Sequence, residues 1–499
     1  MAENKEVTKA GLIESAAVIL LREEEGGLHT FWLRRAKALR MAGGFYAFPG
    51  GKVDAADETT PAEGSAAGLH RFCVAAVREL FEETGVLLAK NVSDFSPRVL
   101  EEFREALMER KADFAQEAKR LGLRLDTSSL VPAGLWITPP FFPVRFYTRF
   151  FLLHCPQGAV PQVRAEEAEE GRWVLPGEAL RLWEEGEALL HPPNLHIMRC
   201  LAGFRSPKQL RYELENPPFC TGHIAQHPEY QRGVLVLPLK SNTLPPAKHT
   251  NTYVLGTGEL WVVDPGFCDE AGRAQCLRTL SELKAMGKTP KGIFLTHQHV
   301  DHVEGAHWLK QQTGLPVACH ALTARHLGFA AERLLEDGET LVLEGPMPMH
   351  WEVLHTPGHA AGHLCLWERR RGILIAGDMV AGQGTISIVP PEGDMAEYVS
   401  QLERLLRLGP RVLHPAHGLC IVDAKAKLES YLRHRAARQR QLLALLRQGV
   451  QEEEALCEGI YGALDQETQT LARGSVQALL CKLQKEGQVA CGGGRWFLC

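Results

Sequence analysis

The stretch Thr296–His302, "THQHVDH", follows directly after the apolar run Ile293–Leu295. An apolar run of this length predicts a buried strand, and side chains just past a strand end can converge in a loop. Neutral imidazoles and a carboxylate are ligands that suit zinc. The stretch therefore predicts a metal site, and its four candidate ligands are His297, His299, Asp301 and His302.

The same arrangement recurs at three positions further along the chain. His359 in "TPGHAAGH", Asp378 in "IAGD" and His417 in "HPAHG" each stand just past an apolar run. A single histidine on an apolar face is more often a core residue than a ligand. Seven candidate ligands at four strand ends favour a metal centre over that simpler explanation.

These motifs resemble those of the metallo-β-lactamase superfamily, whose first, structural motif is matched by Asp264 in "VVDPG". The resemblance implies an αββα sandwich that holds two Zn²⁺ ions, although iron or manganese could occupy the same ligands. It assigns one ion to His297, His299 and His359, and the other to Asp301, His302 and His417, with Asp378 as the bridge.

A dinuclear centre of this kind has a defined chemistry. Two cations about 3.5–4 Å apart lower the pKa of a bridging water and stabilise charge on an attacked phosphoryl or carbonyl centre. Asp301 can also accept a hydrogen bond from that nucleophile, which adds a catalytic role to its ligation. His363 has no metal position left. We assign it to contact with the substrate or with a ligand, while a purely structural role is nearly as well supported.

The segments "TNTYVLGTGELWVVDPG" and "KLESYLRHRAARQRQLLALLR", and the tail "ALLCKLQKEGQV…RWF", are similar to the beta-lactamase-like protein 2 family, including its winged-helix-like end. This resemblance implies an endoribonuclease acting on single-stranded RNA. The superfamily also contains thioesterases of the glyoxalase II type, so thioester chemistry stays open. Phosphate binding agrees with a run of basic residues that a solvated helix face explains equally well: Lys425, Lys427, Arg433, Arg435, Arg438 and Arg440.

A second candidate metal site lies in "RELFEETGV", residues Arg78–Val86. Helical spacing places Glu79, Glu82 and Glu83 on one face of a helix. Carboxylates at that spacing repel one another, and Mg²⁺ or Mn²⁺ would turn the repulsion into a binding site. Taken alone, however, such a face is usually just solvated.

The upstream string "FPGGKVDAAD" changes this interpretation, because together the two strings resemble a split Nudix box. Gly51 matches its leading glycine, here assigned to the substrate site, and Asp57 stands where glutamate is usual. An insertion leaves 20 residues between Asp57 and Arg78 (78 − 57 − 1).

The Nudix motif 19 group carries an insertion at the same place, and its later strands resemble two segments of this chain, "LWITPPFFPVRFYTRFFL" and "EEAEEGRWVLPGEAL". This resemblance implies an α/β/α sandwich and coenzyme A-type diphosphate substrates. The resemblance makes Glu79, Glu82 and Glu83 metal ligands, with Glu82 and Glu83 also catalytic. Arg78 would orient a carboxylate of the box. Glu166 or Glu167 would serve as a distal ligand or base.

Together these patterns predict an α+β multidomain chain: a Nudix domain at 1–205, a Pro-rich linker at 206–233, a metallo-β-lactamase domain at 234–422 and a winged-helix-like domain at 423–499. The 13 cysteines include no CxxC pair, which favours a reducing compartment. No run approaches the roughly 20 apolar residues of a membrane span, and the net charge of -5 is mild. We therefore expect a cytoplasmic protein without a membrane partner. The oligomeric state is left open.

The sequence favours a bifunctional metal-dependent hydrolase. One alternative makes the zinc domain a thioesterase, so that coenzyme A thioesters would link the two activities. Another makes the Nudix domain a ligand sensor without activity, against which the three intact glutamates argue.

Overall fold

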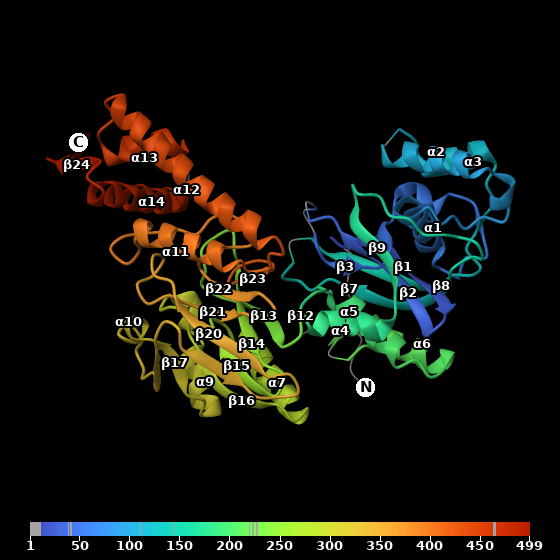
Figure 1. The fold of residues 1–499 in the computed structure, drawn as a ribbon, viewed down its shortest axis with the longest axis horizontal. Coiled ribbons are helices and arrows are strands. Elements are labelled where there is room, and N and C mark those ends of the chain that lie inside the picture. Colours follow the sequence, from blue (N-terminus) through green and yellow to red (C-terminus); the bar gives the residue numbers. More distant parts are fainter. Residues whose placement is uncertain are drawn as a thin grey trace. The chain divides into compact units, whose positions relative to one another are not determined.

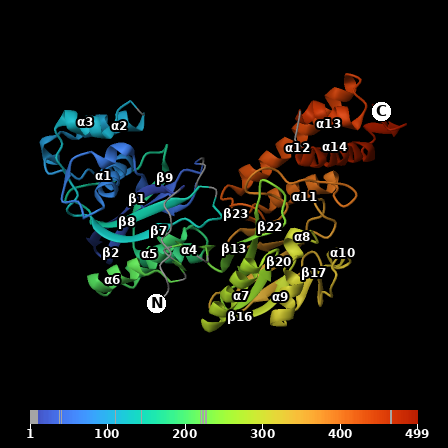
Figure 2. The same ribbon diagram turned by 180° about the vertical axis from the view of Figure 1, so that it is seen from behind.

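The computed structural model of the protein describes residues 11–499, apart from residues 38, 40, 41, 110, 143, 219, 222, 223, 226, 227 and 463–465. The chain forms two compact units, Met1–Arg232 and Gly233–Cys499. In each of them helices lie on the faces of β-sheets (Figures 1 and 2).

The first unit is built on a nine-stranded sheet. Its main path runs β10-β11-β7-β8-β1-β2-β3, while β4 pairs with β1 and β9 pairs with β2. The strands are β1 (Ile13–Glu24), β2 (Gly27–Arg35), β3 (Tyr46–Ala47), β4 (Gly50–Lys52), β7 (Val131–Ile137), β8 (Phe146–His154), β9 (Ala168–Val174), β10 (Cys220–Thr221) and β11 (Ile224–Ala225).

Strand β1 reads as a continuous apolar run because helices cover both faces of the sheet. Its side chains alternate between the faces. Val18 and Leu20 pack into one core with helix α1, whereas Ile19 and Leu21 pack into the other with α4 and α5. The expected α/β/α sandwich is therefore confirmed. Its helices are α1 (His70–Thr84), α2 (Pro97–Met108), α3 (Phe114–Leu121), α4 (Pro176–Glu184) and α5 (Pro192–Ala202), with the 3₁₀ turns η1 (Ala55–Glu58) and η2 (Val92–Asp94).

The insertion that splits the Nudix box is tied to the rest of the unit. Strand β5 (Ala62–Glu63) pairs in parallel with β6 (Leu125–Asp126). The Ser65 hydroxyl makes hydrogen bonds of 3.0 Å to His70 Nδ1 and to Thr127 Oγ1. These contacts fix the chain immediately before α1, so that the insertion leads directly into the glutamate-bearing helix.

Part of the expected linker 206–233 is a helix of the first unit, α6 (Pro207–Glu215). Ser206 caps it by accepting a hydrogen bond from the Gln209 amide, and Pro207 occupies the first turn, where its missing N–H costs nothing. Leu214 is buried in the core beside α5. The linker prediction was wrong for this segment because its proline starts a helix instead of breaking one.

The second unit contains two packed sheets. The first runs in order through β13 (Val234–Lys240), β14 (His249–Leu255), β15 (Glu259–Val263), β16 (Thr289–Phe294), β17 (Val317–His320) and β18 (Arg333–Leu335), with the short β12 (Glu229–Gln231) just before it in the chain. The second runs through β19 (Thr340–Leu343), β20 (Met349–His355), β21 (Leu364–Glu368), β22 (Ile373–Gly377) and β23 (Val412–Pro415).

Helices cover the outer faces of the two sheets, which gives the expected αββα sandwich (Figure 1). Cys276 of α7 and Leu309 of α9 pack with Val262 and Ile293 of the first sheet. Tyr398 of α11 packs in the core of the second sheet. The helices are α7 (Glu270–Ala285), α8 (Val300–Val303), α9 (Ala306–Thr313), α10 (Ala321–Ala324) and α11 (Met395–Leu408).

The C-terminal part consists of α12 (Ala424–Arg447), α13 (Glu453–Tyr461), α14 (Gln466–Lys485) and the hairpin β24–β25 (Val489–Gly492 and Arg495–Leu498). Leu428 and Val476 of this part lie in the same hydrophobic core as Leu374 of β22. The winged-helix-like module is thus packed onto the sandwich through one continuous core. Among the described residues, no helix combines the length and the apolar character that crossing a membrane requires.

Candidate metal centres

Each of the seven expected ligands of the second unit lies in a loop or helix that follows a strand. His297 and His299 follow β16, and α8 carries Asp301 and His302. The others follow β20, β22 and β23, and are His359, Asp378 and His417. The structure brings all seven together, in three overlapping groups whose candidate ligand atoms lie within 4.8 Å of one another.

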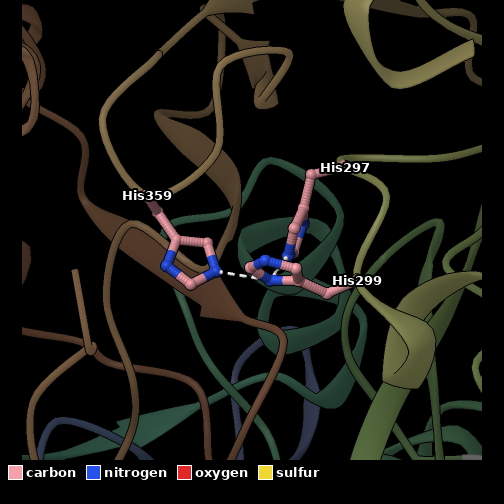
Figure 3. A group of neighbouring side chains, drawn as sticks. All are labelled: His297, His299 and His359. Atoms are coloured by element: carbon pink, nitrogen blue, oxygen red, sulfur yellow. Dashed lines mark hydrogen bonds between the residues drawn. The ribbon is translucent and has the colours of Figure 1, made fainter. Parts of the chain in front are cut away.

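The first group consists of three imidazoles that point toward one another (Figure 3). His299 Nδ1 lies 2.9 Å from His297 Nε2 and 2.9 Å from His359 Nε2. One shared proton cannot satisfy three converging nitrogens, whereas a cation can bind all three lone pairs. The geometry therefore fits one metal ion at this group.

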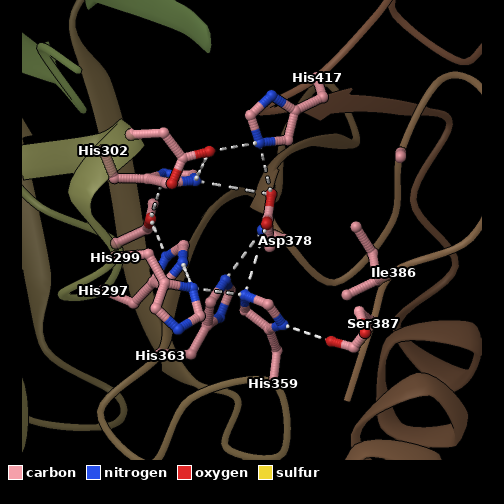
Figure 4. Close-up of polar contacts among 12 residues, drawn as sticks. His297, His299, His302, His359, His363, Asp378, Ile386, Ser387 and His417 are labelled. Atoms are coloured by element: carbon pink, nitrogen blue, oxygen red, sulfur yellow. Dashed lines mark hydrogen bonds and ion pairs between the residues drawn. The ribbon is translucent and has the colours of Figure 1, made fainter. Parts of the chain in front are cut away.

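A second group is formed by Asp301, His302 and His417. Asp378 lies between His302 and His417 of this group and His359 of the first group (Figure 4). Asp378 Oδ1 is 3.7 Å from His302 Nε2 and 3.4 Å from His417 Nε2, and its Oδ2 is 3.4 Å from His359 Nε2. Asp301 Oδ2 lies 3.3 Å from His417 Nε2. The two oxygens of Asp378 thus face different groups, which is the arrangement that a bridging ligand needs.

The ring nitrogen that faces away from the centre is held in every ligand histidine. Such contacts fix ring orientation and the nitrogen left for a metal. The contacts are His297 Nδ1 with Thr296 Oγ1 (2.9 Å), His302 Nδ1 with Asp264 Oδ2 (2.8 Å), His359 Nδ1 with the Ser387 carbonyl (2.9 Å), His417 Nδ1 with the His249 carbonyl (3.0 Å) and His299 Nε2 with Glu392 Oε2 (3.3 Å).

Two buried atoms of this centre lack a hydrogen-bond partner among the residues that the structure describes: His302 Nε2 and Asp378 Oδ1. Leaving such groups unpaired is costly, and both face the place where a metal would sit. Burial opposes the charged form of His302, but the carboxylates of Asp301, Asp264 and Asp378 outweigh it and raise its pKa to about 10. A metal ion would displace that proton and satisfy both atoms. The residues therefore fit a second ion.

Asp264 supports this centre from behind. Its carboxylate accepts hydrogen bonds from the Thr296 amide (2.8 Å) and hydroxyl (2.7 Å), in addition to the contact with His302. Asp264 has a φ of 48°, a value uncommon for a residue with a side chain. Nearby, a Cβ at Gly266 would lie 1.6 Å from the Asp301 carbonyl oxygen. The loop bearing Asp264 and Gly266 therefore packs directly under α8.

His363 lies beneath the ligands and is fully buried. Its Nε2 accepts a hydrogen bond from the Asp378 amide (3.0 Å), and its Nδ1 lies 2.8 Å from Thr356 Oγ1. A side chain in this position holds the backbone of Asp378, and because it is fully buried it does not line the cavity. Of the roles considered for His363, the structure thus supports contact with a ligand and corrects the assignment to substrate.

Glu392 was not found from the sequence, because "PPEGD" carries no ligand signal. Its carboxylate bonds His299 Nε2 and accepts a hydrogen bond from Gln298 Nε2. Glu392 is largely exposed and lines the cavity in front of the metal centre. It is therefore the carboxylate that orients the most exposed of the ligand imidazoles.

The metal centre opens into a cavity of about 450 Å³. Its apolar lining comes from two loops and two helices and includes Leu244, Pro245, Val300, Ile386, Val389 and Leu471. None of the described residues that line it is lysine or arginine. Leu244 is 57% exposed, Val300 54% and Val389 41%, so part of the exposed lining of the cavity is apolar.

In the first unit, α1 brings Glu79, Glu82 and Glu83 beside strand β4. Glu83 Oε2 accepts a hydrogen bond from the Gly50 amide (2.8 Å). A Cβ at Gly51 would lie 2.4 Å from the Glu79 carboxylate, so only glycine permits this approach. Gly51 therefore makes room for a box glutamate. Burial, and then the neighbouring carboxylates, raise the pKa of all three glutamates, that of Glu82 to about 7.

Arg78 is buried, and it makes two hydrogen bonds to Asp57, of 3.1 Å and 2.9 Å. It also donates to Glu79 Oε1 (2.8 Å) and to the Lys52 carbonyl (2.7 Å). Asp57, which stands where the Nudix pattern has glutamate, is thus the partner that positions this arginine. Arg78 therefore contacts a carboxylate of the box.

Of the two acids considered as a distal ligand, Glu167 is the one near the box. Its charge contributes to raising the pKa of all three glutamates, whereas Glu166 is exposed. In the described part of the chain, the tight groups of three ligand atoms all belong to the second unit. The looser carboxylate set still suits Mg²⁺, which keeps several of its waters and needs only one or two carboxylates.

We predict that Glu392→Gln lowers metal affinity at the centre by roughly 10–100-fold, because losing the partner of a ligand histidine has an effect of this size. Competition with a chromophoric chelator measures the affinity. Glu397→Gln is the matched control, because Glu397 is exposed on α11 and its substitution removes the same charge. Equal affinities for the two variants would contradict the orienting role.

We predict that the metal-free Nudix unit loses stability as pH rises from 4.5 toward about 7, the ordinary and folded pKa values of Glu82. A raised folded pKa stabilises the protonated form, and this contribution disappears once the buried carboxyl ionises. Saturating Mg²⁺ should flatten the dependence. Hydrogen exchange of the α1 amides with and without Mg²⁺ measures it. Glu82→Gln should reduce the slope, and an unchanged slope would refute the assignment.

Three family models match the chain: the NUDT19 Nudix domain at residues 67–201, the metallo-beta-lactamase superfamily at 245–417 and the beta-lactamase associated winged helix domain at 453–496. Their order agrees with the predicted order of the domains. Both catalytic families are hydrolases, so the chain is an enzyme of that class.

Curated relatives match about half of the chain. The lactamase-like protein adaB of Aspergillus niger is 30% identical over 268 residues, 50% of this chain and 80% of that protein. The atrochrysone carboxyl ACP thioesterase of Aspergillus fumigatus is 30% identical over 219 residues, 44% and 65% of the two chains. The beta-lactamase-like protein 2 homolog of Caenorhabditis elegans is 26% identical over 246 residues, 48% and 80%. The chain belongs to the metallo-beta-lactamase superfamily and joins that hydrolase domain to a NUDT19-type Nudix domain.

Proposed function

We propose that the second unit hydrolyses acyl thioesters and that the first hydrolyses a diphosphate linkage. The observation that carries the first half is the combination of seven clustered candidate metal ligands with a largely apolar cavity whose described lining contains no lysine or arginine. An acyl group needs apolar walls, whereas a nucleic acid needs cations along its phosphates.

Thioester hydrolysis needs an activated water and a polarised carbonyl. Two divalent ions at the seven ligands would supply both effects at neutral pH. The Asp301 carboxylate, held beside His417, can accept a hydrogen bond from the attacking water. Leu244 and Val300 at the opening exclude bulk water from the acyl chain. The chain's own residues thus provide orientation and a dry binding surface.

Single-stranded RNA, the substrate expected from the sequence, loses part of its support. Arg435 of α12 is buried and donates to the Ile386 carbonyl, and Arg438 donates to the Ile460 carbonyl (2.9 Å). Two residues of the basic run therefore bond backbone carbonyls of the protein itself. The thioesterase among the relatives agrees with the acyl alternative.

For the Nudix unit we infer a Mg²⁺ or Mn²⁺ ion held by Glu79, Glu82 and Glu83, with Glu167 as the distal acid. Hard carboxylate oxygens suit such ions. Arg78 and Gly51 hold Glu79 in place from two sides. A coenzyme A thioester contains both a thioester and a diphosphate, so it is one substrate class on which both units could act.

We predict that the full-length protein hydrolyses acyl-CoA thioesters and, with Mg²⁺, the diphosphate of coenzyme A. Asp301→Asn should lower thioester turnover by roughly 10²–10⁴-fold, the usual contribution of a positioned proton acceptor, and leave the diphosphatase unchanged. Glu82→Gln should do the reverse. Thiol release and phosphate-product chromatography measure the two rates, with a short single-stranded RNA assayed in parallel. Cleavage of RNA without cleavage of any thioester would overturn the proposal.

A further inference from the structure

One wall of the cavity belongs to the winged-helix part of the chain. Leu471 of α14 lines the cavity together with Ile386 and Val389 of the loop that follows β22. Leu471 is half-buried, so part of its side chain is available to a bound molecule. A helix far along the sequence from the metal ligands therefore shapes the space in front of them.

Helix α14 is fixed in this position by close packing. A Cβ at Gly474 would lie 2.7 Å from Val389 Cγ2, so the backbone of α14 sits directly on the cavity loop. Ala472 and Val476 are buried in the same core as Ile388 of that loop. Because closely packed cores do not deform easily, Leu471 has a defined distance from the metal centre.

Helix α12 holds the same loop from another side. The Tyr431 hydroxyl accepts a hydrogen bond from the Ala381 amide (3.0 Å) and donates one to the Gly384 carbonyl (3.0 Å). Arg435 donates to the Ile386 carbonyl, and the next carbonyl, that of Ser387, holds His359 Nδ1 (Figure 4). The apolar wall and one of the metal ligands are thus parts of a single braced segment.

We propose that Leu471 determines the length of the acyl group that the second unit accepts. The inference rests on the proposed thioesterase activity. An acyl chain whose carbonyl lies at the metal centre extends along Ile386 and Val389 and reaches α14, where the Leu471 side chain meets its far end. The size of residue 471 then sets how many methylenes fit, and each methylene in such a pocket changes discrimination by about tenfold or more.

The test compares butyryl-, octanoyl- and palmitoyl-CoA as substrates of the full-length protein. In Leu471→Trp, kcat/KM should fall by about tenfold or more for the longest chain that the wild type accepts well, and stay unchanged for butyryl-CoA. In Leu471→Ala the preference should shift toward longer chains. Gln477→Trp, at an exposed position of the same helix outside the cavity, is the control and should keep the wild-type profile.

The outcomes separate the two proposals. If the wild type hydrolyses thioesters but both Leu471 variants keep its chain-length profile, the role of Leu471 is refuted and the thioesterase stands. If the wild type hydrolyses no thioester of any length, both fail. A Leu471→Trp variant that loses butyryl-CoA turnover as strongly as the longer substrates also refutes the inference. A shift of the profile in opposite directions in the two variants supports it.

Discussion

The second unit depends on one constraint: it buries several ligand atoms so close together that protons alone cannot give each of them a hydrogen bond. His302 Nε2 and Asp378 Oδ1 lack hydrogen-bond partners among the described residues, and three imidazole nitrogens converge at 2.9 Å. Such an arrangement is costly unless cations occupy it. Neighbouring residues hold the ligands in this arrangement: Asp264 bonds His302, and His363 bonds the amide of Asp378.

The same constraint explains why the C-terminal part is packed so closely onto the sandwich. His359 is held by the Ser387 carbonyl, and the loop bearing Ser387 is braced by Tyr431 and Arg435 of α12. The winged-helix part therefore contributes to the hydrolytic site instead of being a separate appendage. In the Nudix unit, the position of Glu79 depends on two neighbours. Gly51 has no side chain and leaves room for the Glu79 carboxylate, and Arg78 donates a hydrogen bond to it.

The sequence was most informative where chemistry is carried by rare residues at strand ends. The clustering of the seven candidate ligands and both sandwiches could be predicted in this way. What depends on tertiary packing could not: Glu392 reaches His299 across 93 positions of sequence, and the apolar cavity is assembled from separate segments. Periodicity likewise does not reveal that Arg435 of the basic helix is buried.

The central claim is that the second unit holds two metal ions bridged by Asp378. Its most direct test is a count of tightly bound transition-metal ions per chain, by mass spectrometry of the metals, in the wild type and in Asp378→Ala. Circular dichroism checks that both are folded. We predict two ions per chain in the wild type and at most one in the variant. Fewer than two ions in the metal-saturated wild type, or two in folded Asp378→Ala, would contradict this account.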